Sequence, residues 1–235
     1  MLNTRRMPPH RRDGFVVAAA CFLIGVTFGV FADSTGLSLG QALALSLLTF
    51  TGASQFAAVS VVAAGGTTVA AVGGALLIGA RNALYGPVVA PLLRGGRVRR
   101  ALAAHFVIDE TTAVASAQVG TDRSRDAFWF TGLWLFAFWN VGTVLGVVVG
   151  GAFEDPGVLG LDAAFPAAFV AMLASHLRTR PGLVAAIGGG AITLVAVPTT
   201  AAGVPMLLAA LAVLPGLWIH RRGGSAPGPD EWAAP

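Results

Sequence analysis

The chain has 235 residues, of which 55% are hydrophobic and 11% charged, with a net charge of +4. A soluble domain carries about a quarter charged residues, and a small globular protein has too much surface to leave so apolar. The composition therefore excludes a water-soluble protein. At about 20 residues for each crossing, the chain has room for about six to eight membrane segments and no sizeable soluble domain.

The positive charge comes entirely from arginine, because the sequence contains no lysine. This bias, with abundant alanine and glycine, suggests a GC-rich bacterial genome and hence a bacterial cytoplasmic membrane. Arginines beside apolar segments are typical of membrane topology, and without a base-stacking aromatic surface they do not indicate a nucleic-acid partner. Cys21 is the single cysteine, which excludes an intrachain disulfide and a thiolate metal site.

Eight apolar segments follow one another along the chain. They span 14–32, 40–64, 67–93, 101–120, 127–150, 163–177, 183–199 and 204–219. The pattern predicts an all-α polytopic membrane protein with a transmembrane domain over 14–220. Before it lies a basic, cytoplasmic N-terminus (1–13), and after it a Gly- and Pro-rich tail (221–235) that we expect to be disordered.

The arginines set the orientation, because cytoplasmic loops carry an excess of them. Four arginines precede the first segment, which places the N-terminus in the cytoplasm. Eight crossings put the arginine-rich loop 94–100 outside, against this rule. In a six-crossing alternative, 40–64 and 101–120 are re-entrant and the loop becomes cytoplasmic.

A short repeat favours eight crossings. Gly25-x-x-x-Gly29 resembles Gly142-x-x-x-Gly146, and the match would relate two halves of four segments as a parallel repeat, an arrangement found in transporters. We therefore expect eight crossings and keep six as the alternative.

Polar residues lie near the middle of four successive segments. They are Gly52, Ala53, Ser54 and Gln55, then Arg81, then Asp109 and Glu110, then Trp139 and Asn140. A charge at the bilayer centre costs about 2.5–3.5 kcal/mol even on insertion scales. Three such charges predict a shared polar cavity at the midplane, surrounded by discontinuous helices.

The charged members have two interpretations each. Arg81 either binds a substrate carboxylate, for which a guanidinium fork is well shaped, or forms a structural ion pair. Asp109 and Glu110 are adjacent, so on a helix they point about 100° apart. One would pair with Arg81 while the other meets an ammonium group or carries a proton, unless both serve packing alone.

The uncharged members are equally open. The small residues from Gly52 to Ser54 either permit close helix packing or break the helix so that backbone groups, Ser54 and Gln55 face a substrate. Trp139 faces lipid or a cavity, and Asn140 needs a buried partner. His105 is isolated, and we do not expect it to bind a metal. No phosphate-binding loop or nucleophile constellation is present, so neither a cofactor nor an enzyme is predicted.

Several stretches match one family in order. They are Gly25–Val30, Phe50–Phe56 (Phe-Thr-Gly-Ala-Ser-Gln-Phe), Arg81 to Gly86 with Pro91, Asp109-Glu110, and Gly160-Leu161-Asp162 leading into Phe165 and Phe169. Over roughly residues 14–220 the chain resembles the AzlC-type branched-chain amino acid transporters. Gly79 and Asn82 stand where that family often carries Asn and His, a departure that concerns the substrate more than the fold. Asn82 remains a candidate substrate-binding residue.

The resemblance implies export of leucine, isoleucine or valine and a small membrane partner of the AzlD type. The leading hypothesis is therefore a secondary transporter for branched-chain amino acids, with proton coupling as its weakest part. The alternative is a scaffold subunit that does not itself transport. A membrane-embedded hydrolase using Asp109 and Glu110 is the least favoured of the three.

Overall fold

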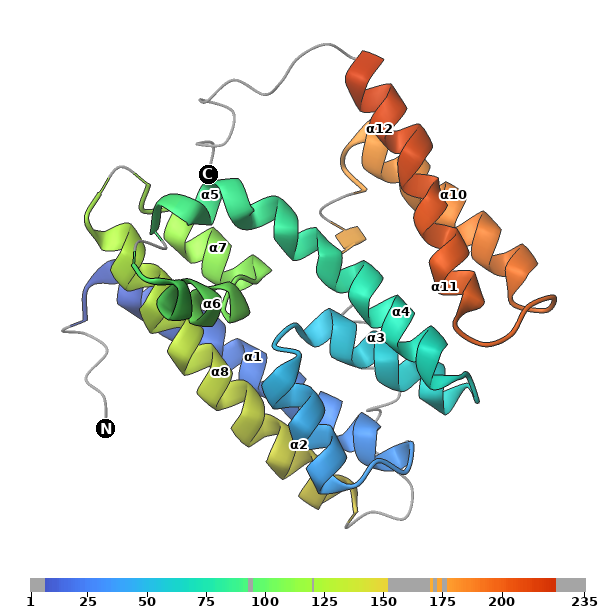
Figure 1. Cartoon of the computed structure of the whole chain (residues 1–235), viewed down its shortest axis with the longest axis horizontal. Helices are drawn as coiled ribbons and strands as arrows, with labels where there is room; N and C mark the ends of the chain where they lie inside the picture. The colour runs from blue at the N-terminus through green and yellow to red at the C-terminus, as the bar shows by residue number, and fades with distance from the viewer. Residues whose placement is uncertain are drawn as a thin grey trace. The chain divides into compact units, whose positions relative to one another are not determined.

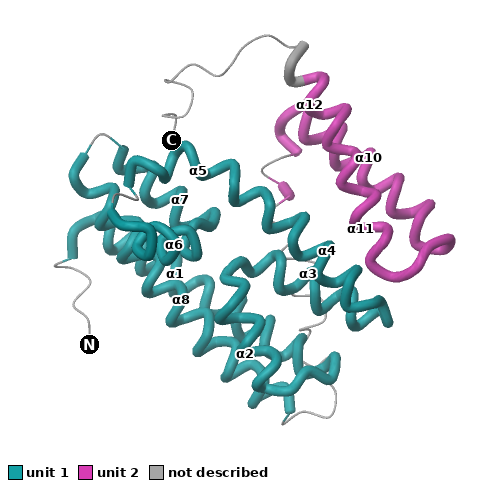
Figure 2. Tube along the Cα trace, viewed as in Figure 1, with its two compact units in different colours: residues 1–165 teal, residues 166–235 magenta. Residues whose placement is uncertain are grey.

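The computed structural model describes residues 7–92, 95–119, 121–151, 170, 173–174 and 177–222, with the side chains of 220–222 left aside. The chain divides into two compact units, residues 1–165 and 166–235, which we describe separately (Figure 2). The described residues form α-helices and short 3-10 helices joined by turns. The protein is an all-α membrane protein, as predicted.

Two long helices form the centre of the first unit. Helix α1 spans Pro9–Ser34 and α8 spans Arg123–Gly150, and both are long and apolar enough to cross a membrane. Helix α1 begins at Pro9, five residues before the predicted apolar segment, because Pro8 and Pro9 suit the first turn of a helix.

Glycines bring α1 and α8 into backbone contact. A Cβ on Gly25 would lie 2.8 Å from the Trp139 carbonyl oxygen, and a Cβ on Gly142 would lie 2.6 Å from the Phe22 carbonyl oxygen. Gly29 likewise faces Gly146. Residue numbers rise together on both helices, so the helices run parallel. The two Gly-x-x-x-Gly motifs of the predicted repeat thus pack against each other.

An ionic contact joins the first turns of the same two helices. The Arg11 guanidinium donates to both carboxylate oxygens of Asp126, at 2.7 and 2.6 Å, and His10 Nε2 lies 2.7 Å from Asp126 Oδ2. The Arg11 guanidinium also lies 5.4 Å from the ring centroid of Phe130. This cluster fixes the register of α1 on α8 at their N-terminal ends.

Two predicted segments are each broken into a pair of short helices. The segment 40–64 forms α2 (Leu39–Leu48) and α3 (Gly52–Ala63), and the segment 101–120 forms α6 (Arg97–His105) and α7 (Asp109–Ser116). At 1.5 Å per residue these helices are about 12–18 Å long, about half of a hydrocarbon core. The expectation of discontinuous helices is confirmed.

A further helical stretch connects the two broken segments. It consists of α4 (Thr68–Gly79), the 3-10 helix η2 (Ala80–Tyr85), α5 (Gly86–Val89) and the 3-10 helix η3 (Ala90–Leu92). A turn with Gly65 at a φ of 75° leads from α3 into α4, and the two helices pack side by side. Figure 1 shows α4 to α5 running in the direction opposite to α1 and α8.

The second unit is a helical hairpin. Helix α10 spans Arg180–Ala196, and the returning arm consists of α11 (Val204–Ala209), η5 (Ala210–Ala212) and α12 (Val213–Arg222). Gly203, with a φ of 89°, begins the return. These elements match the predicted segments 183–199 and 204–219. The predicted segment 163–177 and the tail after 222 fall almost entirely outside the described residues.

Candidate functional site

Gln55 stabilises the first break, which is the non-helical stretch 49–51 between α2 and α3. Its side-chain amide donates to the Thr49 carbonyl at 2.6 Å, and its Oε1 accepts the indole N–H of Trp139 at 2.9 Å. Gln55 is fully buried, and Gly52 lies against the Trp139 ring, where a Cβ would collide. Three predicted site residues therefore come together, but the hydrogen bonds of Gln55 go to the protein itself and stabilise residues 49–51 in their non-helical path.

A threonine stabilises the second break, residues 106–108 between α6 and α7, in the same way. The Thr111 hydroxyl donates to the Phe106 carbonyl at 2.6 Å and accepts the Ile108 backbone N–H at 3.2 Å. Helix α7 then runs back along α8, where the Ser124 hydroxyl donates to the Ala115 carbonyl at 2.8 Å. In both segments, a side chain from the first turn of the second helix binds the backbone carbonyl at the end of the first helix.

The two breaks meet in a cluster of four aromatic rings, Phe50, His105, Phe106 and Phe136. Every pair among these four rings is in contact, with centroids 5.0 to 5.8 Å apart. Phe50 comes from the first break, His105 from the end of α6, Phe106 from the second break and Phe136 from α8. We call this group the four-ring cluster. It joins two segments that are about 55 residues apart in the sequence through edge-to-face and tilted contacts, which stabilise aromatic pairs.

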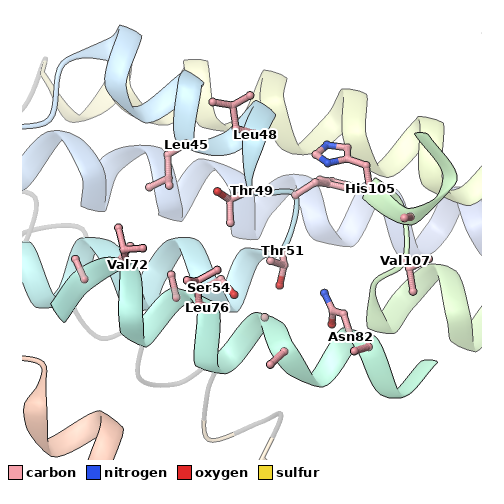
Figure 3. A pocket seen from close by; sticks show the side chains of 18 of the residues that line it. Leu45, Leu48, Thr49, Thr51, Ser54, Val72, Leu76, Asn82, His105 and Val107 are labelled. Carbon is pink, nitrogen blue, oxygen red and sulfur yellow. The ribbon is translucent and has the colours of Figure 1, made fainter. Parts of the chain in front are cut away.

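A cavity of about 790 Å³ lies beside the four-ring cluster, between α2, α3 and α4 (Figure 3). Its walls are mostly aliphatic, as is usual for small-molecule sites. The polar wall residues are Thr49, Thr51, Ser54, Asn82 and His105. In Figure 3, Thr51 and Asn82 point toward each other across the cavity.

Two wall residues carry polar atoms that lack a partner. Ser54 Oγ and Asn82 Oδ1 are buried and make no hydrogen bond to any residue that the structure describes. A Cβ on Gly79 would lie 3.2 Å from Ser54 Oγ, so the glycine leaves space for the hydroxyl at the contact of α3 with α4. Unpaired buried polar groups are costly, and both could bind a ligand in the cavity.

The predicted ion pair is present next to this cavity. Arg81 Nη2 lies 2.9 Å from Asp109 Oδ2, and each side chain is about a third exposed. Arg81 Nε and Asp109 Oδ1 are buried and have no hydrogen-bond partner within the described part of the chain, so each group has spare hydrogen-bonding capacity there. Neither residue lines the cavity itself, but the neighbours of Arg81, Ala80 and Asn82, do.

The remaining candidates lie apart from the cavity wall. Ala53 is buried in α3, and Trp139 is buried with its ring stacked on Phe28 at 6.2 Å. The Asn140 amide donates to the Phe136 carbonyl of its own helix at 2.8 Å. Glu110 lies partly exposed in the first turn of α7.

Residues 16–153 match the AzlC protein family. This stretch covers more than half of the chain. The chain belongs to the AzlC family. The match includes most of α1, both broken segments and α8, and therefore the whole candidate site.

Relatives of this AzlC protein carry membrane names. It is 29% identical to the inner membrane protein YgaZ of Escherichia coli over 88% of this chain and 84% of the relative. It is also 29% identical to a membrane protein of Archaeoglobus fulgidus over 84% of this chain and 88% of the relative. No solved structure matches the chain.

The AzlC site contains residues that the sequence analysis did not select. Thr49, Thr51 and His105 line the cavity, and Thr111 holds the second break. Phe50 and Thr51 belong to the motif that carries the family resemblance, which is a signal that could have selected them. His105 and Thr111 have no comparable signal, because only the fold brings His105 beside Phe50 and the cavity.

Proposed function

We propose that this protein is a secondary transporter that exports hydrophobic, branched-chain amino acids across the bacterial cytoplasmic membrane. The observation that carries the proposal is an aliphatic cavity next to the Arg81–Asp109 ion pair. A small zwitterion with an apolar side chain matches such a site. Membership of the AzlC family and the membrane relatives support a transport-related role in general, and the substrate and direction are part of the proposal.

In the proposed bound state, the zwitterion is shared between the two charges. The guanidinium of Arg81 binds the carboxylate, because a planar fork suits it. The Asp109 carboxylate meets the ammonium group. The unpaired oxygens of Ser54 and Asn82 contribute further hydrogen bonds, and the aliphatic wall of α4 receives the side chain.

Export of labelled leucine is the direct test. Vesicles that contain the protein, with its membrane partner where the cell supplies one, are loaded with labelled leucine and diluted. We expect efflux above that of protein-free vesicles, slowed by excess unlabelled valine and unaffected by excess lysine, which is too polar for the cavity. Release no faster than from protein-free vesicles would contradict the proposal.

We further propose six crossings, with α2–α3 and α6–α7 as re-entrant pairs. Each of these helices is about half a bilayer long, and α3 and α4 run side by side in opposite directions. The stretch from α4 to η3 runs opposite to α1, which agrees with a re-entrant 40–64 and not with a second full crossing. In this arrangement the arginines of 94–100 face the cytoplasm, in agreement with the positive-inside rule.

Labelling of single cysteines tests the crossing number. In a Cys21→Ala background, Arg97→Cys is expected to react with a membrane-impermeant maleimide in everted vesicles and not in intact cells. Gly40→Cys serves as the control. It lies directly after the turn that joins α1 to α2, and both the six- and the eight-crossing arrangement place this turn on the outer side of the membrane. Labelling of Arg97→Cys in intact cells would instead support eight crossings.

The resemblance also leads us to propose a small membrane partner of the AzlD type, which binds this chain in the bilayer. We expect affinity purification of this chain in a mild detergent to recover the small partner at a fixed ratio to the chain. If the chain transports leucine fully when purified alone, the partner has no part in the activity.

A further inference from the structure

The cavity wall contains one ionisable side chain among the described residues, His105. The other polar wall residues are hydroxyl and amide side chains, which remain uncharged at all physiological pH values. An imidazole is the side chain that changes charge between about pH 5 and 8.

His105 also contacts the parts of the fold that define the cavity. Its ring lies 5.8 Å from Phe50 of the first break, at an interplanar angle of 31°, and 5.8 Å from Phe136 of α8. It is the last residue of α6, directly before the second break. A change of charge on His105 is thus felt at both breaks together.

The rings in contact with His105 provide no counter-charge for an imidazolium. Phe50, Phe106 and Phe136 are uncharged, so the cluster offers an imidazolium only aromatic rings, whose faces attract a cation weakly and whose edges do not. Among the described residues, His105's own helix carries Arg97, Arg99 and Arg100 in its first turn. The neighbouring elements carry Arg81 and Tyr85 on η2, Asp109 and Glu110 on α7, and Arg123, Arg125 and Asp126 at the start of α8. Arg81 and Asp109 are paired with each other, which leaves their charges largely neutralised.

We infer that His105 is the proton-binding residue of the cavity, which couples amino-acid transport to the pH gradient. The inference rests on the proposed transport function and replaces the acidic pair as the carrier of the proton. Protonation places a cation in the four-ring cluster and changes how Phe50 packs against the second break. Deprotonation restores the neutral aromatic contact. The proton crosses with one substrate per cycle, bound to and released from an imidazole nitrogen.

The test compares two activities in the same vesicles. Counterflow of labelled leucine against unlabelled leucine reports substrate binding and movement without net proton flow. Net movement under an imposed gradient of one pH unit reports coupling, because one proton per substrate shifts the distribution about tenfold. The variants are His105→Gln, which keeps a polar group, and His105→Phe, which keeps a ring in the cluster. The control is His10→Gln, at the Asp126 contact far along the sequence from the cavity.

We expect wild type and His10→Gln to respond to the gradient. Both His105 variants are expected to keep a reduced but measurable counterflow, because His105 lines the cavity, and to lose the gradient response, so that the ratio of internal to external leucine under the gradient falls to about one. A full gradient response in either His105 variant would overturn the inference, as would loss of counterflow in both variants, since His105 would then serve packing or substrate binding. Wild-type counterflow without any gradient response also overturns it and leaves the transport function standing. Absence of wild-type counterflow overturns the proposed function itself.

Discussion

Replacement of Arg81 with alanine is expected to lower leucine efflux about 10- to 100-fold. The variant removes charge-assisted hydrogen bonds, each worth about 1.5–3 kcal/mol, and leaves the Asp109 carboxylate without its partner. Arg81→Lys keeps the charge but loses the planar fork, so we expect an intermediate rate. Initial rates of leucine efflux at matched protein levels are the measurement.

The double variant separates a ligand role of Arg81 from a structural one. If Arg81 only neutralises Asp109, Arg81→Ala combined with Asp109→Ala should recover most of the efflux, because no unpaired charge remains. If Arg81 binds the substrate carboxylate, the double variant stays as slow as the single one. A third result, an Arg81→Ala protein that also loses its membrane partner during purification, would favour the scaffold hypothesis.

Replacement of Gly146 with valine is expected to prevent stable packing of α1 on α8. A Cβ at this position collides with the Val26 carbonyl and lies 2.8 Å from Gly29 Cα. Ordinary overpacking costs about 1–3 kcal/mol. A larger cost is expected here, because the obstacle is backbone and cannot rotate away. We expect Gly146→Val to disappear from the membrane fraction, and Gly146→Ala to remain with a melting temperature several degrees lower.

Gly190 provides a matched control for this experiment. It also lies within a helix, α10, but a Cβ there meets nothing within 4 Å. Gly190→Ala should therefore melt at or slightly above the wild-type temperature, since alanine favours helix over glycine. Fluorescence-detected size-exclusion chromatography after heating measures all three variants. Equal melting of Gly146→Ala and wild type would show that α1 and α8 are not in backbone contact.

The sequence predicted helices in the segments that the structure describes. It offered the first break as one of two interpretations, because Gly52 and the polar residues after it interrupt an otherwise apolar segment. The second break could not be located in this way. It falls at Phe106-Val107-Ile108, three apolar residues that read as continuous helix, and depends on a hydrogen bond from Thr111 to the Phe106 carbonyl. Apolar periodicity carries no information about such a bond.

The candidate site was predicted in part for a similar reason. Charges in apolar segments are costly, and this rule led to Arg81 and Asp109, which the structure places 2.9 Å apart. It could not tell which polar groups face the cavity and which bind the protein. Gln55 was expected to face a substrate, yet its amide is bonded to Thr49 and Trp139, whereas His105 had no sequence signal at all.

Glycine contacts between α1 and α8 have a mechanical consequence. Where two helices touch through bare backbone, neither can rotate about its axis without a carbonyl oxygen colliding with the other helix. The bonds from Arg11 to Asp126 also oppose sliding of α1 along α8. The two helices therefore form one rigid unit. In the proposed transport cycle, rearrangement would fall to the half-length helices, which meet at residues 49–51 and 106–108, where Gln55 and Thr111 hydrogen-bond the Thr49 and Phe106 carbonyls.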